Sequence, residues 1–220
     1  VAGAGLASML AGGGSMMYDK MNTPEPQHPQ VQQVQKGPQV SQQQIDKAKE
    51  LMSTPAGKTL IKTAMASGIK GTELAQFVAQ CSHETADFTT MKEFGGKLDF
   101  KKYDIKYNPT KAKALGNLKP GDGAKYFGRG FIQLTGRYNY KKAGEALGLP
   151  LEKHPELVER PDVAAKVAVW FWQQRVQPNV NNFSNTAQAT KPINPALKHL
   201  NQRNDKFAAT KLAMNEPTKR

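Results

Sequence analysis

The stretch from Val163 to Phe171 constrains the fold of this chain more than any other. Apolar side chains cover most of the circumference that a helix would have here, and they belong to Val163, Ala164, Val167, Ala168, Trp170 and Phe171. In a soluble protein, a helix that is apolar almost all round is buried at the centre of the core. The sequence therefore predicts a central helix with the other elements packed around it.

Composition divides the chain into three parts. Residues 1–21 form an apolar leader rich in Gly and Ala, and residues 22–40 form a linker or strap rich in Gln and Pro. The linker can bury too little apolar surface to offset the entropy lost on ordering. The folded domain is predicted over residues 41–220, because Ser41 and Gln44 form a capping box ahead of an apolar helical pattern.

The leader carries no side-chain charge from Val1 to Met17. It lacks the basic start of a signal peptide and the roughly 20 strongly apolar residues of a membrane span. It is interpreted either as a flexible or partner-packed terminus or as a membrane-active or assembly-docking helix. The first residue is Val rather than Met, which favours a processed product or a fragment of a longer protein.

The net charge points to an anionic partner. Thirty-one Lys and Arg residues against eighteen Asp and Glu give +13, which suits nucleic acid, an acidic lipid surface or a polyanionic cell-wall polymer. Specific nucleic-acid binding is not expected, because the aromatic residues follow core patterns and are not interleaved with the basic ones. Cys81 is the only cysteine, so the sequence offers neither an intrachain disulfide nor a cysteine-based metal site.

A second helix is predicted from Thr72, a good N-cap. Its apolar face carries Leu74, Phe77, Val78 and Cys81. Glu84 falls on or beside this face, and partial burial raises the pKa of a Glu above about 4.3, toward the range of a general acid. The alternative is a structural ion pair with Arg129 or Arg137, and helical phase does not separate the two interpretations.

A second carboxylate is available in the loop that follows this helix. The candidates are Asp87, Glu93, Asp99 and Asp104, and spacing alone does not rank them. The same region is crowded with lysines, namely Lys97, Lys101, Lys102, Lys106, Lys111 and Lys113. For any single lysine, a solvated face is the simpler interpretation.

The segment YFGRGFIQLTGRYNY, residues 126–140, is the most specific in the chain. Residues 131–135 alternate as a short strand would, so Gln133 and Thr135 share one face and the aliphatic residues pack on the core. Their amide and hydroxyl could hold a substrate hydroxyl and a water molecule. The same alternation also fits any half-buried strand.

Together these segments resemble glycoside hydrolase family 19, the chitinases and the related phage and bacterial endolysins that cut peptidoglycan. The 126–140 segment is similar to the family signature, and His83-Glu84-Thr85 resembles its His-Glu-Thr or His-Glu-Ser motif at the catalytic acid. AAKVAVWFWQQR resembles the long buried helix of the family, and residues 190–203 resemble its Ile-Asn and later Arg elements. The resemblance covers roughly residues 45–211 and implies a mainly α, lysozyme-like helical domain with a small strand element.

The resemblance also implies roles for individual residues. Glu84 would be the general acid, Glu93 the general base, and Thr135 would orient the attacking water. The substrate-binding residues would be His83, Tyr126, Arg129, Gln133, Asn139, Asn194 and Arg203, the last also bracing the acid. The reaction would proceed with inversion, which calls for carboxyl groups about 6.5 to 9.5 Å apart. No metal or cofactor is implied.

Three departures from the family pattern bear on these roles. Ala86-Asp87 stands where many members have two glycines, which leaves Asp87 as an outside candidate for the second carboxylate. Pro195 replaces the usual glycine after Asn194, at the predicted start of the last helix. The segment between Glu93 and Tyr126 is short and lysine-rich, which favours a compact, endolysin-like enzyme over a plant-type chitinase.

The sequence thus predicts a muramidase that cleaves β-1,4 bonds of bacterial peptidoglycan. One setting is a phage virion-associated lysin that acts at the host periplasm or cell wall. Residues 1–40 would then contact tail or capsid proteins or a membrane. The other setting is a secreted, wall-directed enzyme. The alternatives are a chitinase that cuts β-1,4-linked N-acetylglucosamine and a non-catalytic structural part of a virion.

Overall fold

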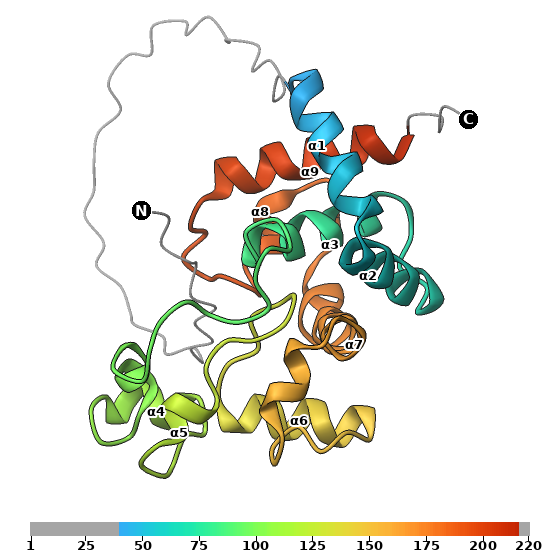
Figure 1. Cartoon of the computed structure of the whole chain (residues 1–220). Helices are drawn as coiled ribbons and strands as arrows, with labels where there is room; N and C mark the ends of the chain where they lie inside the picture. Colours follow the sequence, from blue (N-terminus) through green and yellow to red (C-terminus); the bar gives the residue numbers. More distant parts are fainter. Residues whose placement is uncertain (1–39, 216–220) are drawn as a thin grey trace, which may run out of the picture.

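The computed structural model describes residues 40–215 (Figure 1). Its helices are α1 (Gln42–Ser53), α2 (Pro55–Ala66), α3 (Gly71–Glu84), α4 (Pro109–Ala114), α5 (Asp122–Lys125), α6 (Arg137–Leu147), α7 (Pro161–Phe171), α8 (Thr186–Thr190) and α9 (Leu200–Asn215). Short turns of other helix types are η1 (Asp99–Tyr103), η2 (Pro155–Glu159), η3 (Trp172–Val176) and η4 (Gln177–Asn179). The predicted leader and, apart from Val40, the predicted linker lie outside the described residues.

The predicted central helix is α7, and its burial is confirmed. Val163, Val167 and most of the residues between them are buried, and the helix packs against α2, α6 and η2. Figure 1 shows it between α6 and the group formed by α1, α2 and α3. The chain continues into a π-helical turn, where Trp172 is buried and meets the ring of Phe77 on α3 edge on, with 5.2 Å between the ring centroids.

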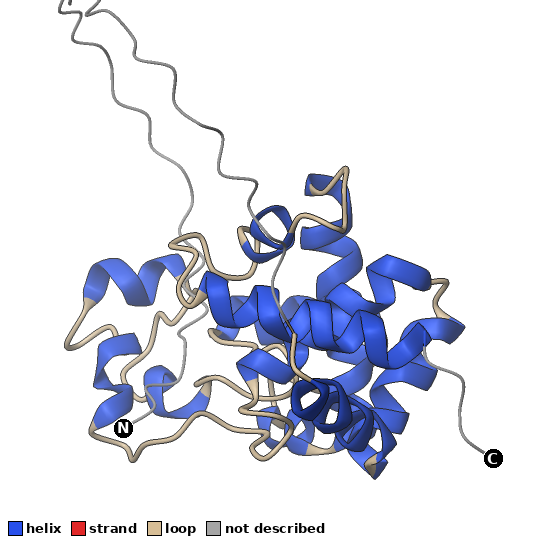
Figure 2. Cartoon of the chain, turned by 90° about the horizontal axis from the view of Figure 1, so that it is seen from above, coloured by secondary structure: helices blue, strands red, loops and turns tan. Residues whose placement is uncertain are grey.

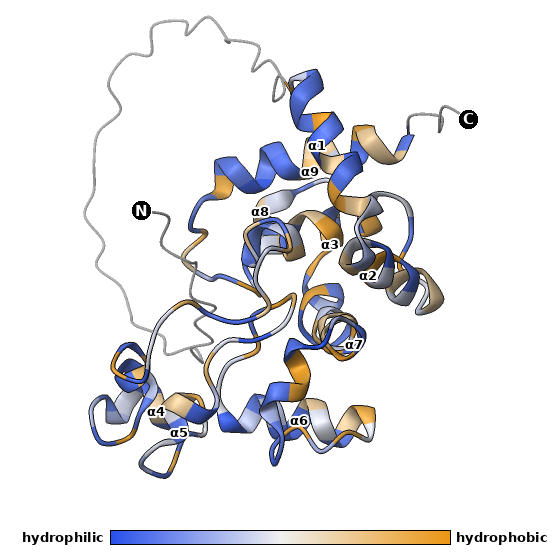
Figure 3. Cartoon of the chain, in the orientation of Figure 1, coloured by the Kyte–Doolittle hydropathy of each residue, from blue (hydrophilic) through white to orange (hydrophobic). Residues whose placement is uncertain are grey.

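The remaining helices surround this centre. α9 packs along both α3 and α1, and it carries hydrophilic colouring over much of its length (Figure 3). The predicted capping box at Ser41 and Gln44 is present at the start of α1. The start of α3 differs slightly from the prediction, since its N-cap is Lys70 and not Thr72.

Residues 94–125, called the lysine-rich lobe below, contain η1, α4 and α5. This lobe has a small apolar centre of its own, formed by Phe100, Tyr103 and Leu115. The ring of Phe127 stacks on Phe100 with 4.2 Å between the ring centroids. In Figure 1 the lobe lies at the opposite end of the molecule from α1 and α9.

The mainly α class is confirmed, but two local predictions are wrong. The strand predicted over residues 131–135 is a tight turn, because Gln133 takes a left-handed conformation with φ of 52°. Among the described residues, extended pairing is limited to two isolated antiparallel bridges, and Figure 2 shows helices joined by loops. The last helix begins at Leu200 rather than at Asn194, because Leu197 and His199 also have positive φ.

No helix within residues 40–215 has the length and apolar character needed to cross a membrane.

Candidate active site

The carboxyl of Glu84 lies at the last residue of α3 and is buried. Its Oε1 accepts a hydrogen bond of 2.5 Å from Nη2 of Arg203 on α9, and Arg203 is itself fully buried. Oε2 is also buried and has no hydrogen-bond partner among the described residues. One oxygen is therefore held by the fold and the other is left for a ligand or a proton.

Burial raises the pKa of Glu84, and the charge and hydrogen bond of Arg203 oppose that rise without cancelling it. The carboxyl is thus both desolvated and ion-paired, so the structure shows the feature on which each interpretation of Glu84 rested. Its partner is neither Arg129 nor Arg137, which pair with Glu159 and with Asp122 and Glu152.

A row of buried amides leads along α3 to Glu84. Gln76 and Gln80 stand eight and four residues before it, on the same face of the helix. Gln80 accepts a 2.5 Å hydrogen bond from Nη1 of Arg203 and donates one of 3.0 Å to Thr190 on α8. Gln76 is not among the residues predicted for the site, and neither is Gln80. The regular spacing of the three polar residues was the signal available in the sequence.

Glu93 lies on the loop after α3 and is also buried. Its backbone N donates to the carbonyl of Gly128 at 2.8 Å, which ties the loop to the 126–140 segment. Its Oε1 accepts hydrogen bonds from the hydroxyl of Tyr103 at 3.0 Å and from Nζ of Lys102 at 2.8 Å. Both donors come from the lysine-rich lobe, and neither was predicted as part of the site.

Gly128 is the point at which three predicted residues come together. A Cβ built on Gly128 would lie 3.0 Å from Oε1 of Gln133 and 3.3 Å from both Oε2 of Glu93 and Oγ1 of Thr135. Thr135 is held in place because its carbonyl accepts a 2.7 Å hydrogen bond from Nδ2 of Asn139. A carboxylate, an amide and a hydroxyl thus converge where a water molecule could be bound and activated.

The loop that joins the two carboxylates is fixed to the 126–140 segment. The ring of Phe88 meets that of Phe131 edge on, with 5.2 Å between centroids, and the carbonyl of Met91 accepts a 2.7 Å hydrogen bond from the backbone N of Gly130. The course of the chain from Glu84 to Glu93 is therefore fixed by contacts with the 126–140 segment.

Asp87, the outside candidate, is used for a different purpose. Its carboxylate is paired with Lys47 on α1 and Lys206 on α9, and it accepts a 2.7 Å hydrogen bond from Oγ of Ser82. These cationic and hydroxyl partners outweigh burial and lower the pKa of Asp87 to about 2. The residue joins three helices and is not among the groups gathered at Gly128.

The other two carboxylate candidates support the lysine-rich lobe. Asp99 accepts a 2.8 Å hydrogen bond from the backbone N of Gly96, and Asp104 accepts one of 2.6 Å from that of Gly121. Both side chains therefore cap turns of the lobe. Of the four candidates, only Glu93 lies next to Thr135.

Two residues predicted to bind substrate make their contacts within the protein. Tyr126 is fully buried, and its hydroxyl donates a 2.9 Å hydrogen bond to the carbonyl of Glu152. Arg129 is buried, pairs with Glu159 at 2.8 Å and lies over the ring of Phe127. The structure does not bring either one to the group around Gly128.

Two further predicted residues remain: His83 directly precedes Glu84, and Asn194 follows α8. His83 is partly buried, and burial followed by the charge of Arg203 lowers the pKa of its imidazole to about 3. Asn194 is buried just after α8, and its Nδ2 has no hydrogen-bond partner among the described residues. A buried donor without a partner suits a ligand acceptor such as a sugar carbonyl. The roles predicted for all these site residues stay predictions.

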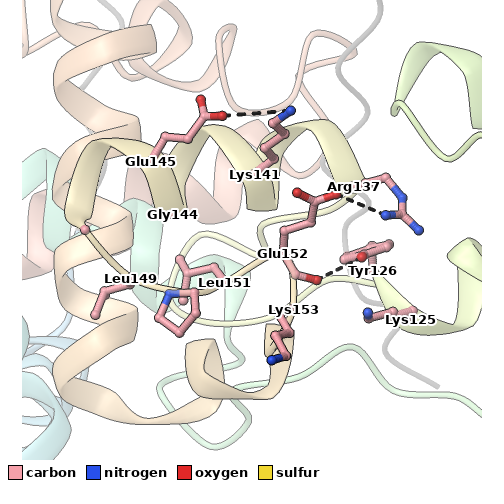
Figure 4. Close-up of a pocket in the computed structure, with 12 residues that line it drawn as sticks. Lys125, Tyr126, Arg137, Lys141, Gly144, Glu145, Leu149, Leu151, Glu152 and Lys153 are labelled. Atoms are coloured by element: carbon pink, nitrogen blue, oxygen red, sulfur yellow. Dashed lines mark hydrogen bonds and ion pairs between the residues drawn. The ribbon is translucent and has the colours of Figure 1, made fainter.

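A cavity of about 530 Å³ lies beside α6, and it is a different site (Figure 4). Its two carboxylates, Glu145 and Glu152, are more exposed and pair with Lys141 and Arg137, as the dashed lines in Figure 4 show. A carboxylate neutralised at the surface lacks the desolvation that prepares Glu84. Nowhere in residues 40–215 do three His, Cys, Asp or Glu side chains come together to hold a metal ion.

Comparison with known proteins gives relatives of one kind. A family profile for glycosyl hydrolase 19, described as "Chitinase class I", matches residues 53–196, more than half of the chain. A glycosyl hydrolase family 19 domain-containing protein of Haemophilus influenzae is 32% identical over 164 residues, which cover 64% of this chain and 80% of that protein. An endochitinase of Arabidopsis thaliana is 38% identical over 126 residues, which cover 56% of this chain and 44% of the plant protein. The chain thus spans less than half the length of this plant relative.

Among solved structures, chitinase C from Streptomyces griseus superposes with a TM-score of 0.60 at 27% sequence identity, covering 81% of this chain and 94% of that one. A second bacterial family 19 chitinase has a TM-score of 0.57 at 22% identity and shares the fold. The helical arrangement described above is therefore one that solved proteins also adopt.

Proposed function

Because the chain belongs to glycoside hydrolase family 19, we propose that it hydrolyses the β-1,4 bond between N-acetylmuramic acid and N-acetylglucosamine in bacterial peptidoglycan. Glu84 protonates the leaving glycosidic oxygen, and Glu93 activates a water molecule that attacks the anomeric carbon from the opposite face with inversion. Thr135 and Gln133 orient that water. Arg203 holds Glu84 in place, and Asn194 contacts the sugar.

The observation that carries this proposal is the contrast between the two carboxyl groups. Glu84 is desolvated, its pKa is raised, and one of its oxygens lacks a partner. Glu93 is ion-paired with Lys102 and lies beside Thr135. Two carboxyl groups in such different surroundings suit an acid and a base that act in the same step.

The preference for peptidoglycan rests on charge. The net charge of +13 favours an acidic polymer, whereas neutral chitin gains nothing from it. The lysine-rich lobe, which supplies two contacts to Glu93, contains Lys97, Lys101, Lys102, Lys106, Lys111, Lys113, Lys119 and Lys125. An acidic glycan that approaches Glu93 therefore meets a strongly basic surface.

A chitinase is the second candidate. It is favoured by the comparisons, because the relatives from Arabidopsis thaliana and Streptomyces griseus are named as chitinases. The same acid and base would serve that reaction. The two candidates are separated by the turnover of purified peptidoglycan against chitin oligomers.

The test measures the release of reducing ends from both polymers by wild type, Glu84→Gln and Glu93→Gln. The exposed Glu145 supplies a matched control as Glu145→Gln. We expect wild type and the control to cut peptidoglycan, and each site variant to lose at least about 100-fold in kcat, in line with the usual size of acid–base contributions. Full activity in Glu84→Gln would contradict the proposal. A wild type that cuts neither polymer would also contradict it, and that result would favour a structural role for the protein.

The biological setting is a separate part of the proposal. The sequence of residues 1–40 motivates a virion-associated lysin that acts on the host wall during genome entry, with the leader and linker docked on tail or capsid proteins. Purified particles should then contain the chain. Recovery only as a free monomer, absent from particles, would contradict this setting without touching the enzymatic proposal.

A further inference from the structure

Two ammonium groups of the lysine-rich lobe share one aromatic ring beside Glu93. Nζ of Lys102 lies 4.9 Å and Nζ of Lys111 lies 4.8 Å from the ring centroid of Tyr103. The hydroxyl of the same tyrosine bonds Glu93. Lys102 forms an ion pair with Glu93, whereas Lys111 has no ion pair among the described residues.

The charge of a third lysine, from another part of the chain, also acts on Lys111. Lys198 precedes α9, and its carbonyl accepts a 3.1 Å hydrogen bond from Nε of Arg203, the arginine that holds Glu84. Burial and then the charge of Lys102 lower the pKa of Lys111; Lys198 acts in the same direction and Glu93 opposes it. Lys198 thus belongs to the support of the acid while its charge acts on a lysine next to the base.

Two ammonium groups therefore lie over the ring of a tyrosine that bonds Glu93, and the charge of Lys198 adds to theirs at Lys111. Like charges that are held together repel, and desolvation adds to the cost. The most direct relief is an anion bound among them, which forms charge-assisted hydrogen bonds with ammonium groups. A carboxylate carried by the substrate is such an anion, and it would reach these lysines from a sugar bound between Glu84 and Glu93.

N-acetylmuramic acid differs from N-acetylglucosamine by a lactyl ether. Its carboxyl is free or is joined to a peptide that carries carboxylates of its own. We propose that Lys111 and Lys198, assisted by Lys102, bind a carboxylate of the muramoyl unit next to the bond that is cut. This inference rests on the proposed function and names the chemical group by which that site selects an acidic glycan.

The experiment compares three forms of one glycan. Strands freed of peptide present the lactyl carboxylate, intact strands present peptide carboxylates, and strands whose carboxyls are converted to neutral amides present neither. The double variant Lys111→Gln/Lys198→Gln is compared with wild type. Lys58→Gln/Lys62→Gln, two exposed positions on α2, is the matched control for the loss of two charges.

For wild type and for the control, we expect kcat/KM on at least one acidic form to exceed that on the amidated form. In the site variant this ratio should fall about 10-fold, the equivalent of one lost charge-assisted contact. The acidic form that shows the larger fall identifies the carboxylate. An unchanged ratio, or an equal fall in the site variant and the control, would overturn the inference.

Measurements of glycan binding distinguish a failure of the lysine site from a failure of the proposed function. Glu84→Gln provides an inactive background in which the dissociation constants of the acidic and amidated strands are measured with and without the two lysine substitutions. If wild type cuts no peptidoglycan, the proposed function fails, and the affinity ratio still decides the lysine site. Tighter binding of acidic strands that depends on the two lysines supports it, and equal affinities contradict it.

Discussion

Arg203 on α9 donates a 2.5 Å hydrogen bond to Oε1 of Glu84, which lies 119 residues earlier on α3. Neither side chain is open to solvent. The pair contains two opposing influences on the acid, because burial favours the neutral carboxyl and the guanidinium favours the ionised one.

Arg203→Gln removes the guanidinium that favours the ionised form of Glu84. Burial then acts alone, so the pKa of Glu84 rises further, and activity, which needs the protonated acid, persists to higher pH. We expect the alkaline limb of the kcat/KM profile to move upward, with a stability loss of about 3 kcal/mol from breaking a buried pair. Arg175→Gln, at an exposed position, is the control. A limb that moves downward would contradict this account of Glu84.

Gly128→Ala tests the convergence of Glu93, Gln133 and Thr135. The new methyl group would lie 3.0 to 3.3 Å from all three polar side chains, so they must shift by a few tenths of an ångström. We expect kcat to fall about 10-fold, since small misplacements at a reacting centre are costly, while thermal unfolding changes little. Gly96→Ala, where a Cβ meets nothing within 4 Å, should leave the rate unchanged.

Tyr103→Phe tests the contact of the lobe with the proposed base. The substitution removes the hydroxyl that donates to Glu93 at 3.0 and 3.2 Å and keeps the ring that packs in the lobe. Hydrogen bonds to charged groups contribute about 1.5–3 kcal/mol, so kcat should fall at least about 10-fold. Tyr107→Phe, on an exposed ring of the same lobe, is the comparison. Equal rates in the two variants would exclude a role for Tyr103 in holding Glu93.

Asp87→Asn tests the carboxylate that joins α1, α3 and α9. Because its folded-state pKa is lowered to about 2 from 3.8, the ionised form contributes stability above pH 4, and that contribution is lost as the pH falls toward 2. At neutral pH the variant should be less stable than wild type by on the order of 1–2 kcal/mol, and the difference should shrink steadily as the pH falls from 4 through 2. Denaturant unfolding at several pH values measures it, with the exposed Asp46→Asn as control. A difference that is as large at pH 2 as at pH 7 would show that charge is not the cause.

Helical periodicity was enough to locate Glu84. Phe77, Cys81 and Glu84 lie on one unbroken helix, and the repeat of 3.6 residues places the carboxyl beside the apolar face. The same rule could have shown Gln76 and Gln80 in line with it. Polar residues at this spacing usually predict a solvated face, however, and only the contacts of Gln80 with Arg203 and of both glutamines with α8 explain their burial.

The loop residues could not be placed from local patterns. The position of Glu93 depends on the turn after α3, where Ala86, Asp87 and Phe88 all have positive φ, and no sequence period encodes such a turn. Resemblance to a family identified Glu93, whereas its contacts with Lys102 and Tyr103 required the structure. The predicted strand failed for the same reason, since a single left-handed residue, Gln133, ends the alternation.

The two carboxyl groups are supported by different parts of the chain. The contacts of Glu84 come from α3 and α9, whereas those of Glu93 come from the lysine-rich lobe and the backbone at Gly128. The surroundings of Glu84 therefore do not depend on the lobe, whereas an insertion, a deletion or a charge change in the lobe acts directly on Glu93. The loops of the lobe can thus differ in length and charge while α3 and α9 keep the same buried pair.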